Sequence, residues 1–261
     1  RRWGKSSLVT HAAKQLLMSE ENVKLCMIDL FNVREEEGFY TLLAKEVLTA
    51  VSSKWEEIAV NAKNFLARLI PRISFTADVE SELSFGIGFL LSYVAEKLNI
   101  SPDDILDLAE ALAVSKNIRL IICIDEFQNV ANFGDSLAFQ KKLRAHWQRH
   151  TRVAYCLFGS KRHMLMDVFA NVSMPFYKFG DLMFLQKIET EEWIPFIRQK
   201  FQMTDKVIER DEIQLLVELV DKHPYYVQQL AQQVWLRTEK FVVPSIVKEA
   251  YNGLIDQLSL L

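Results

Sequence analysis

The sequence predicts an α/β protein with helices on both faces of a parallel sheet, followed by a second, all-helical unit. Four short apolar runs, each bounded by polar or turn residues, are typical of buried strands: 23–30, 118–125, 153–158 and 183–188. Helical patterns lie between these runs, and strands that alternate with helices favour a parallel sheet covered on both faces. The length of 261 residues is sufficient for two units.

The helices are predicted from apolar residues at helical spacing. One helix should follow Gly4, because apolar side chains recur there on one face: Leu8, Val9, Ala12, Ala13, Leu16 and Leu17. After residue 190 the strand patterns stop, and four segments are helical in pattern: 191–201, 211–220, 225–237 and 244–257. Asp211 and Glu212 suit a helix N-terminus, where negative charge is favoured. We therefore predict an α/β domain over 1–188 and a helical domain over 189–261.

Residues from about 55 to 112 do not fit a minimal α/β core. Their pattern is helix, then residues 72–89, then helix again, and 74–83 shows the apolar/polar alternation of an exposed hairpin. We interpret this stretch as an insertion that forms a lobe at the rim of the domain.

Composition excludes several classes of function. The chain has 31 basic and 34 acidic residues, and its net charge of −3 gives no global attraction to nucleic acid or anionic membranes. The longest apolar stretch, 86–95, is too short to cross a bilayer. Cys26, Cys123 and Cys156 lie in apolar runs without metal-ligand spacing, and we interpret them as buried, reduced thiols. A soluble, cytoplasmic setting is expected. Arg1 is not a start methionine, which suggests a fragment.

The first residues match the second half of a phosphate-binding loop, G-x-x-x-x-G-K-[ST]. In such a loop, backbone N–H groups and the N-terminus of the next helix surround the phosphates. Lys5 would reach the β- and γ-phosphates, and Ser6 would place its hydroxyl on Mg²⁺. The alternative is a chance Gly-Lys-Ser with an ordinary serine cap. The predicted nucleotide-binding residues here are Arg2, Trp3, Gly4, Lys5, Ser6 and Ser7.

A second motif supports the first. Residues 120–124 are apolar and lead into Asp125 and Glu126, the Walker B arrangement of a strand that ends in two carboxylates. Asp125 would hold Mg²⁺, and Glu126 would orient and deprotonate the attacking water. Ligands of open α/β sheets bind beyond the strand ends. A solvated turn is the alternative for this second motif alone, but both motifs occur in the expected order and contexts. Together they predict a P-loop NTPase fold.

The motifs resemble those of archaeal-type ATPases of the AAA+/STAND group. The resemblance rests on the residues Arg1-Arg2-Trp3-Gly4-Lys5-Ser6-Ser7, Ile124-Asp125-Glu126-Phe127-Gln128, Phe158-Gly159-Ser160 and His223-Pro224-Tyr225-Tyr226, and it spans nearly the whole chain. It implies an ATP-binding α/β domain with a helical lid that works as an ATP-driven switch, with ATP and Mg²⁺ as ligands.

The resemblance also implies two sensor positions. Ser160 matches sensor 1, with Lys161 and Arg162 as nearby charged candidates, and His223 and Pro224 match the lid motif that meets the nucleotide. Two simpler interpretations stay open: Ser160 caps the next helix, and Pro224 occupies the first turn of its helix. Related proteins often carry an arginine shortly before the last strand. Here only Lys178 supplies charge, which puts an arginine finger in doubt.

A basic stretch precedes the sensor strand: Lys141, Lys142, Arg144, His146, Arg149, His150 and Arg152. Three interpretations are open, namely a solvated helix face, a homo-oligomer edge that offers Arg149 or Arg152 to a neighbouring phosphate, and a local contact with DNA.

The leading hypothesis is an ATPase with Glu126, Lys5 and Ser160 as catalytic residues and Ser6 and Asp125 as metal ligands. Water polarised by Glu126 would attack the γ-phosphate in line. The guanine-recognition element Asn-Lys-x-Asp is absent from the sequence, which disfavours GTP. A small-molecule kinase, a DNA-associated ATPase or loader, and a module that holds ATP with little turnover are the alternatives.

Overall fold

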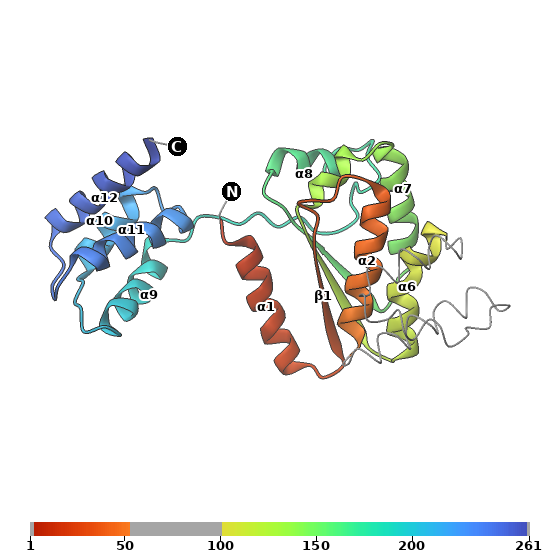
Figure 1. Ribbon diagram of the computed structural model, residues 1–261, viewed down its shortest axis with the longest axis horizontal. Coiled ribbons are helices and arrows are strands. Elements are labelled where there is room, and N and C mark those ends of the chain that lie inside the picture. Colours follow the sequence, from red (N-terminus) through yellow and green to blue (C-terminus); the bar gives the residue numbers. More distant parts are fainter. Residues whose placement is uncertain (1–2, 53–100, 260–261) are drawn as a thin grey trace, which may run out of the picture. The chain divides into compact units, whose positions relative to one another are not determined.

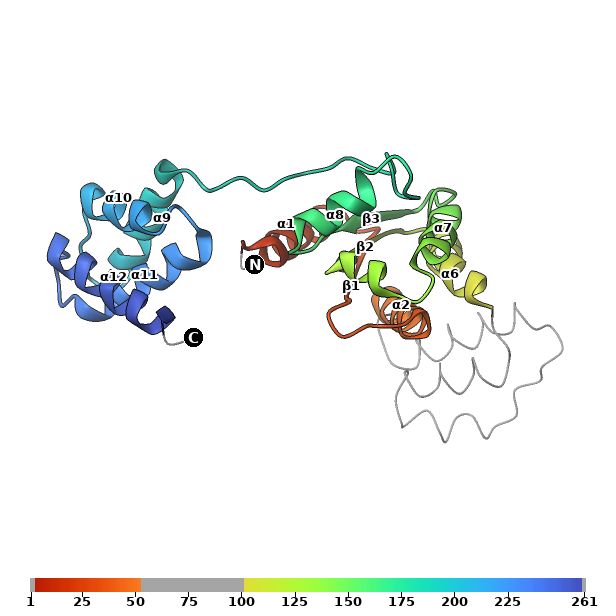
Figure 2. The same ribbon diagram turned by 90° about the horizontal axis from the view of Figure 1, so that it is seen from above.

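The computed structural model describes residues 3–52 and 101–259, and Figures 1 and 2 show it in two views. Its residues cluster into two compact units: Ser6–Asp181, and Arg1–Lys5 together with Leu182–Leu261. Most of the predicted insertion, including the hairpin predicted at 74–83, lies outside the described residues. Only the end of the predicted insertion is described, where it forms part of a helix.

The first unit is built on a parallel sheet, as predicted. Its strands β1 (Val23–Asp29), β2 (Arg119–Asp125) and β3 (Val153–Leu157) lie in the order β1-β2-β3, and both neighbouring pairs are parallel. Both views place α1 on the opposite side of the sheet from α2 and α6 (Figures 1 and 2). The helical elements of this unit are α1 (Lys5–Ser19), α2 (Glu36–Val51), α6 (Pro102–Ser115), η2 (Phe127–Asn132), α7 (Ser136–Trp147) and α8 (Arg162–Phe169).

Local chemistry explains where these helices begin. Ser101 caps α6 through a capping box with Asp104, and Pro102 occupies the first helical position, where its missing N–H costs nothing. Asp135 accepts a hydrogen bond from the N–H of Ala138 at the start of α7. The core between sheet and helices is aromatic and aliphatic, and its largest fully buried side chains include Phe39, Phe127, Phe139, Phe176, Leu106 and Ile122.

The predicted strand at 183–188 is wrong. The segment is irregular, and three of its apolar side chains are exposed, namely Phe184 and Ile188 at 40% and Met183 at 85%. A buried strand needs a neighbour for its backbone hydrogen bonds. Within the described residues no strand pairs with this segment, so its apolar composition does not make it part of the sheet.

The second unit is helical, and all four predicted helices are present. They are α9 (Thr190–Gln202), α10 (Arg210–Leu219), α11 (Pro224–Arg237) and α12 (Pro244–Ser259). Asp211 and Glu212 lie in the first turn of α10 as predicted. The helices enclose a separate apolar core that includes Trp193, Ile197, Phe201, Leu216, Val227 and Val234. Lys206 closes the C-terminal end of α11 by donating to the carbonyls of Trp235 and Thr238, at 2.7 Å and 2.5 Å.

Cys26 and Cys123 are buried and all three cysteines are free thiols, but Cys156 is only partly buried. None of the helices in the described residues has the length and apolarity needed to span a membrane.

Candidate functional site

Gly4 and the start of α1 form the predicted phosphate-binding segment. Gly4 has a φ of 77°, a left-handed conformation that glycine adopts without steric cost. α1 begins at Lys5, which places Ser6 and Ser7 in its first turn, and that turn contains no acidic residue. The first N–H groups of a helix have no partner within it and can bind an anion. Arg2 lies outside the described residues.

Ser6 and Asp125 are brought together although 119 positions separate them. The Ser6 hydroxyl donates to Oδ2 of Asp125 at 2.6 Å, and Oδ1 accepts the N–H of Glu126 at 2.8 Å. Asp125 is the last residue of β2, where the strand meets the edge of the sheet. A hydroxyl and a carboxylate are hard oxygen ligands of the kind Mg²⁺ prefers. These two groups therefore fit the predicted metal site.

Glu126 turns the chain out of β2 and is held by two side chains. Its backbone is left-handed, with a φ of 52°, which is uncommon for a residue other than glycine. The Ser160 hydroxyl donates to its Oε2 at 3.0 Å, and the Gln128 amide donates to the same oxygen. Ser160 thus contacts the carboxylate rather than capping α8, whose N-cap is Lys161. The surrounding contacts fix where this carboxylate lies.

Backbone hydrogen bonding between the two chain segments continues beyond the ends of β2 and β3. The N–H of Phe158 donates to the carbonyl of Ile124, and the N–H of Phe127 donates to the carbonyl of Phe158, both at 3.0 Å. These two hydrogen bonds place Gly159 and Ser160, which follow Phe158, next to Glu126. A Cβ at Gly159 would lie 1.9 Å from Oε1 of the fully buried Gln128, so only glycine fits there without rearrangement.

Two residues near this edge were not predicted as site residues. Asp29 is the register partner of Asp125 at the end of β1, so a further carboxylate lies at the same edge of the sheet. The Gln128 amide donates to the Glu126 carboxylate, and its side chain occupies the space that a side chain at Gly159 would need. The sequence carried a signal for Asp29, because it lies near the end of a predicted parallel strand and such ends share one edge. It carried none for the direction of the Gln128 side chain.

In the second unit, the predicted lid residue His223 contacts Trp3. The two rings are edge-to-face with centroids 5.1 Å apart. The ring centroid of Tyr226 lies 4.9 Å from that of His223. Pro224 occupies the first position of α11, directly after His223. Two of the predicted nucleotide-binding residues, Trp3 and His223, are therefore neighbours within this unit.

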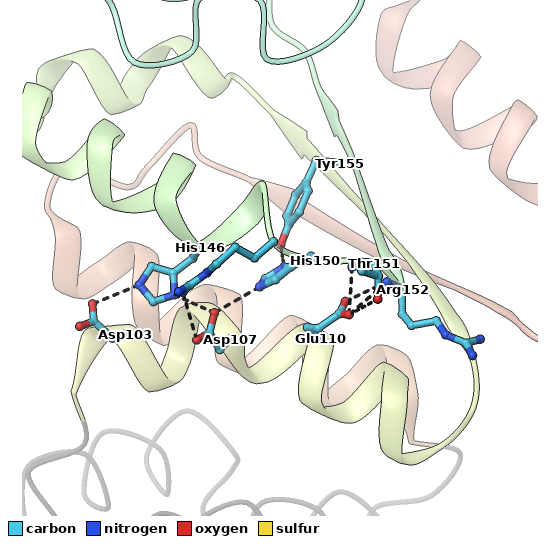
Figure 3. A network of polar contacts seen from close by, with 9 residues as sticks. Asp103, Asp107, Glu110, His146, His150, Thr151, Arg152 and Tyr155 are labelled. Carbon is cyan, nitrogen blue, oxygen red and sulfur yellow. Dashed lines mark hydrogen bonds and ion pairs between the residues drawn. The ribbon is translucent and has the colours of Figure 1, made fainter.

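Part of the basic stretch is bound to acidic side chains of α6 (Figure 3). His146 Nδ1 lies 2.7 Å and His150 Nε2 lies 3.2 Å from the same oxygen of Asp107. His146 Nε2 is 3.4 Å from Asp103, and His150 Nδ1 is 2.8 Å from the Tyr155 hydroxyl. Burial raises the pKa of Asp107, but hydrogen bonds from the two histidines outweigh it and hold the pKa below 3.8.

Glu110 continues this network one helical turn further along α6. Its carboxylate accepts a hydrogen bond from the N–H of Thr151 at 2.9 Å and one from the N–H of Arg152 at 2.9 Å. It also accepts a hydrogen bond from the Thr151 hydroxyl at 2.8 Å. Arg149 lies 3.7 Å from Asp107, with 63% of its side chain exposed. The carboxylates at 103, 107 and 110 share one face of α6, so this part of the basic stretch has a structural role.

Arg144 and Lys178 have local partners. Arg144 donates to the carbonyl of Tyr177 at 2.8 Å and to the carbonyl of Pro175. Lys178 has a φ of 53°, and its ammonium lies 5.4 Å from the Tyr177 ring centroid. Arg144 therefore holds the loop that leads into Lys178.

Comparisons with known proteins identify the fold. Searches against protein-family models and curated proteins gave no match. Among solved structures, the chain is similar to the Walker-type ATPase PABY2304 of Pyrococcus abyssi, with a TM-score of 0.60 and 17% identity over 100% of this chain and 66% of that one.

It is also similar to the ORC2 protein of Aeropyrum pernix in its ADPNP–ADP complexes, with a TM-score of 0.59 and 13% identity over 97% of this chain and 58% of that one. The chain thus spans less than two thirds of either protein. These structures, with the parallel sheet and its flanking helices, show that the chain has a P-loop NTPase type of α/β fold.

Proposed function

We propose that this chain is an ATPase module of the AAA+/STAND type, which binds ATP with Mg²⁺, hydrolyses it slowly and couples the reaction to closure of its helical lid. The observation that carries the proposal is the 2.6 Å contact between Ser6 and Asp125. It joins the serine of the phosphate loop to the carboxylate at the end of β2, as a shared magnesium site requires.

A second contact supports hydrolysis rather than binding alone. Glu126 follows Asp125 directly, and Ser160 and Gln128 hold its carboxylate at the sheet edge. A carboxylate held in this way can orient a water molecule and accept its proton. The similarity to a Walker-type ATPase and to a protein solved with ADPNP and ADP agrees with this role.

In the proposed reaction, the side chains divide the work. Ser6 and Asp125 would hold Mg²⁺, which neutralises phosphate charge when it is bound. Lys5 would place a second positive charge on the β- and γ-phosphates, and backbone N–H groups at the start of α1 would bind their oxygens. Glu126 would align the attacking water. Ser160, which follows β3, would connect that strand to the Glu126 carboxylate through its hydrogen bond. Trp3, Ser7, His223 and Pro224 are proposed to complete nucleotide binding.

The proposal is tested by separating binding from turnover. Glu126→Gln should keep affinity for a fluorescent ATP analogue but lower phosphate release about a hundredfold or more, the usual contribution of a general base. Lys5→Ala should lose nucleotide binding. Lys14→Ala, on the same helix, and Glu249→Gln, on α12, are matched controls that should behave as the parent chain. Equal turnover in Glu126→Gln and the parent would contradict the mechanism.

The basic stretch supports two further partners as alternatives. Lys141, Arg149 and Arg152 remain exposed, so a homo-oligomer edge or DNA could use them. ATP turnover measured with and without duplex DNA at low salt tests the second. DNA binding that weakens with salt and with removal of these charges would favour a DNA-associated ATPase. Absence of binding at low salt would remove it.

A further inference from the structure

Cys123 on β2 and Cys156 on β3 lie directly opposite each other. They are register partners in neighbouring parallel strands, so both side chains leave the same face of the sheet. Neighbouring strands are about 4.7–4.9 Å apart. This lies within the range of about 4.4–6.8 Å between Cα atoms that a disulfide bond can bridge. The backbone therefore places the two thiols within bonding reach.

The two thiols already interact and differ in reactivity. The Cys123 thiol donates a hydrogen bond to the sulfur of Cys156, which outweighs burial and lowers the pKa of Cys156 to about 7. Cys156 is partly exposed and Cys123 is buried. A small disulfide therefore reaches Cys156 first, and Cys123, its register partner, lies where it can resolve the mixed disulfide.

Cys26 shows that this arrangement is specific to the pair. Its register partner is Ile122, which precedes Cys123 and therefore faces the opposite side of the sheet. Cys26 belongs to the apolar core, whereas Cys123 and Cys156 are outside that cluster. Burial, with a contribution from Glu46, raises the pKa of Cys26 to about 12. Cys26 is thus an internal control for thiol chemistry in this chain.

We propose that Cys123 and Cys156 form a dithiol–disulfide couple, a modification site that low-molecular-weight disulfides such as oxidised glutathione convert to an intramolecular disulfide. The thiolate of Cys156 attacks one sulfur of oxidised glutathione, the S–S bond breaks, and one glutathione leaves as a thiolate that takes up a proton. Cys123 then loses its proton and attacks the Cys156 sulfur of the mixed disulfide, releasing the second glutathione. Two protein thiols are oxidised and one small disulfide is reduced to two thiols.

The position of the couple makes its state structurally relevant. Cys123 precedes Asp125 by two residues and therefore lies on the same face of β2. A disulfide here would link β2 to β3 two residues before Asp125, the residue that accepts the hydrogen bond of Ser6. The chemistry of the couple does not depend on what that edge binds.

The test follows each cysteine after exposure to oxidised glutathione. The parent chain and Cys26→Ser should yield a β2 peptide linked to a β3 peptide by a disulfide, detected by mass spectrometry after alkylation. Cys123→Ser should keep one glutathione on residue 156, because its resolving thiol is missing. Cys156→Ser should form neither product. A glutathione adduct retained by the parent chain as fully as by Cys123→Ser would overturn the proposal.

A second measurement uses only the unsubstituted chain and so avoids any effect of the variants on folding. Phenylarsine oxide binds two neighbouring thiols through one arsenic atom. One equivalent should protect Cys123 and Cys156 together from alkylation without protecting Cys26. Independent alkylation of Cys123 and Cys156 in its presence would show that the thiols do not act as a pair.

Discussion

Replacing Gly159 by alanine would place a methyl group where the structure leaves no room for it. The new Cβ would lie 1.9 Å from Oε1 and 3.0 Å from Cδ of Gln128, and 3.4 Å from the Cα of Glu126. Gln128 is fully buried, and its amide donates to the carboxylate of Glu126. The side chain therefore cannot swing away without breaking that bond.

The cost follows from these contacts. Overpacking a closely packed site costs about 1–3 kcal/mol, and a hydrogen bond to a charged group contributes about 1.5–3 kcal/mol. Because moving Gln128 relieves the clash only by breaking this bond, the two ranges describe one event and are not added. We expect Gly159→Ala to lower the free energy of unfolding of the α/β unit by about 2 kcal/mol.

A double-mutant cycle measures this effect. Hydrogen exchange of the β2 and β3 amides, followed against denaturant, reports the stability of this unit alone. Gln128→Ala removes the clashing atoms, so in that background Gly159→Ala should cost less than about 0.5 kcal/mol. Gly134→Ala is the matched control, because an added Cβ there meets nothing within 4 Å. An equal cost in both backgrounds, or no excess over Gly134→Ala, would refute the steric argument.

Two further predictions concern charged side chains. Asp107→Asn should flatten the pH dependence of the free energy of unfolding. The pKa of Asp107 is lowered in the folded state, so the ionised carboxylate stabilises the fold above its ordinary pKa, and this stabilisation is lost as pH falls below about 3.8. Urea denaturation between pH 3 and 6 checks this, and an unchanged profile that matches the exposed control Asp167→Asn would contradict it. Lys206→Met should destabilise the helical unit by about 1–3 kcal/mol, because two carbonyls at the end of α11 lose a charged donor. Thermal unfolding compared with Lys248→Met tests it, and equal stability of the two variants would count against this role.

Local patterns were sufficient where a segment's own residues decide its structure. The three strands of the sheet were predicted because each apolar run is short and bounded by polar residues. The helices of the second unit were predicted because their apolar periodicity is strong, and Pro224 and Pro244 both occupy first helical positions. The segment 183–188 is also a short apolar run, yet it is irregular, and no described strand pairs with it.

The site shows the same division. The sequence placed Ser6 at a helix start and Asp125 at a strand end, and parallel topology requires such ends to share one edge. Their contact at 2.6 Å is consistent with that expectation. The role of Gln128 could not be predicted, because it depends on the left-handed backbone of Glu126 and on the missing side chain of Gly159.

The sequence by itself determined the order of the three sheet strands and of the four C-terminal helices, the two motifs and the cysteine positions, because each depends on residues close together in the chain. Tertiary structure decided which side chains meet. It brought the histidines of the basic stretch to α6, because Asp103 and Asp107 share one face of that helix. It also set Cys123 opposite Cys156, because the register between parallel strands depends on packing across the whole sheet.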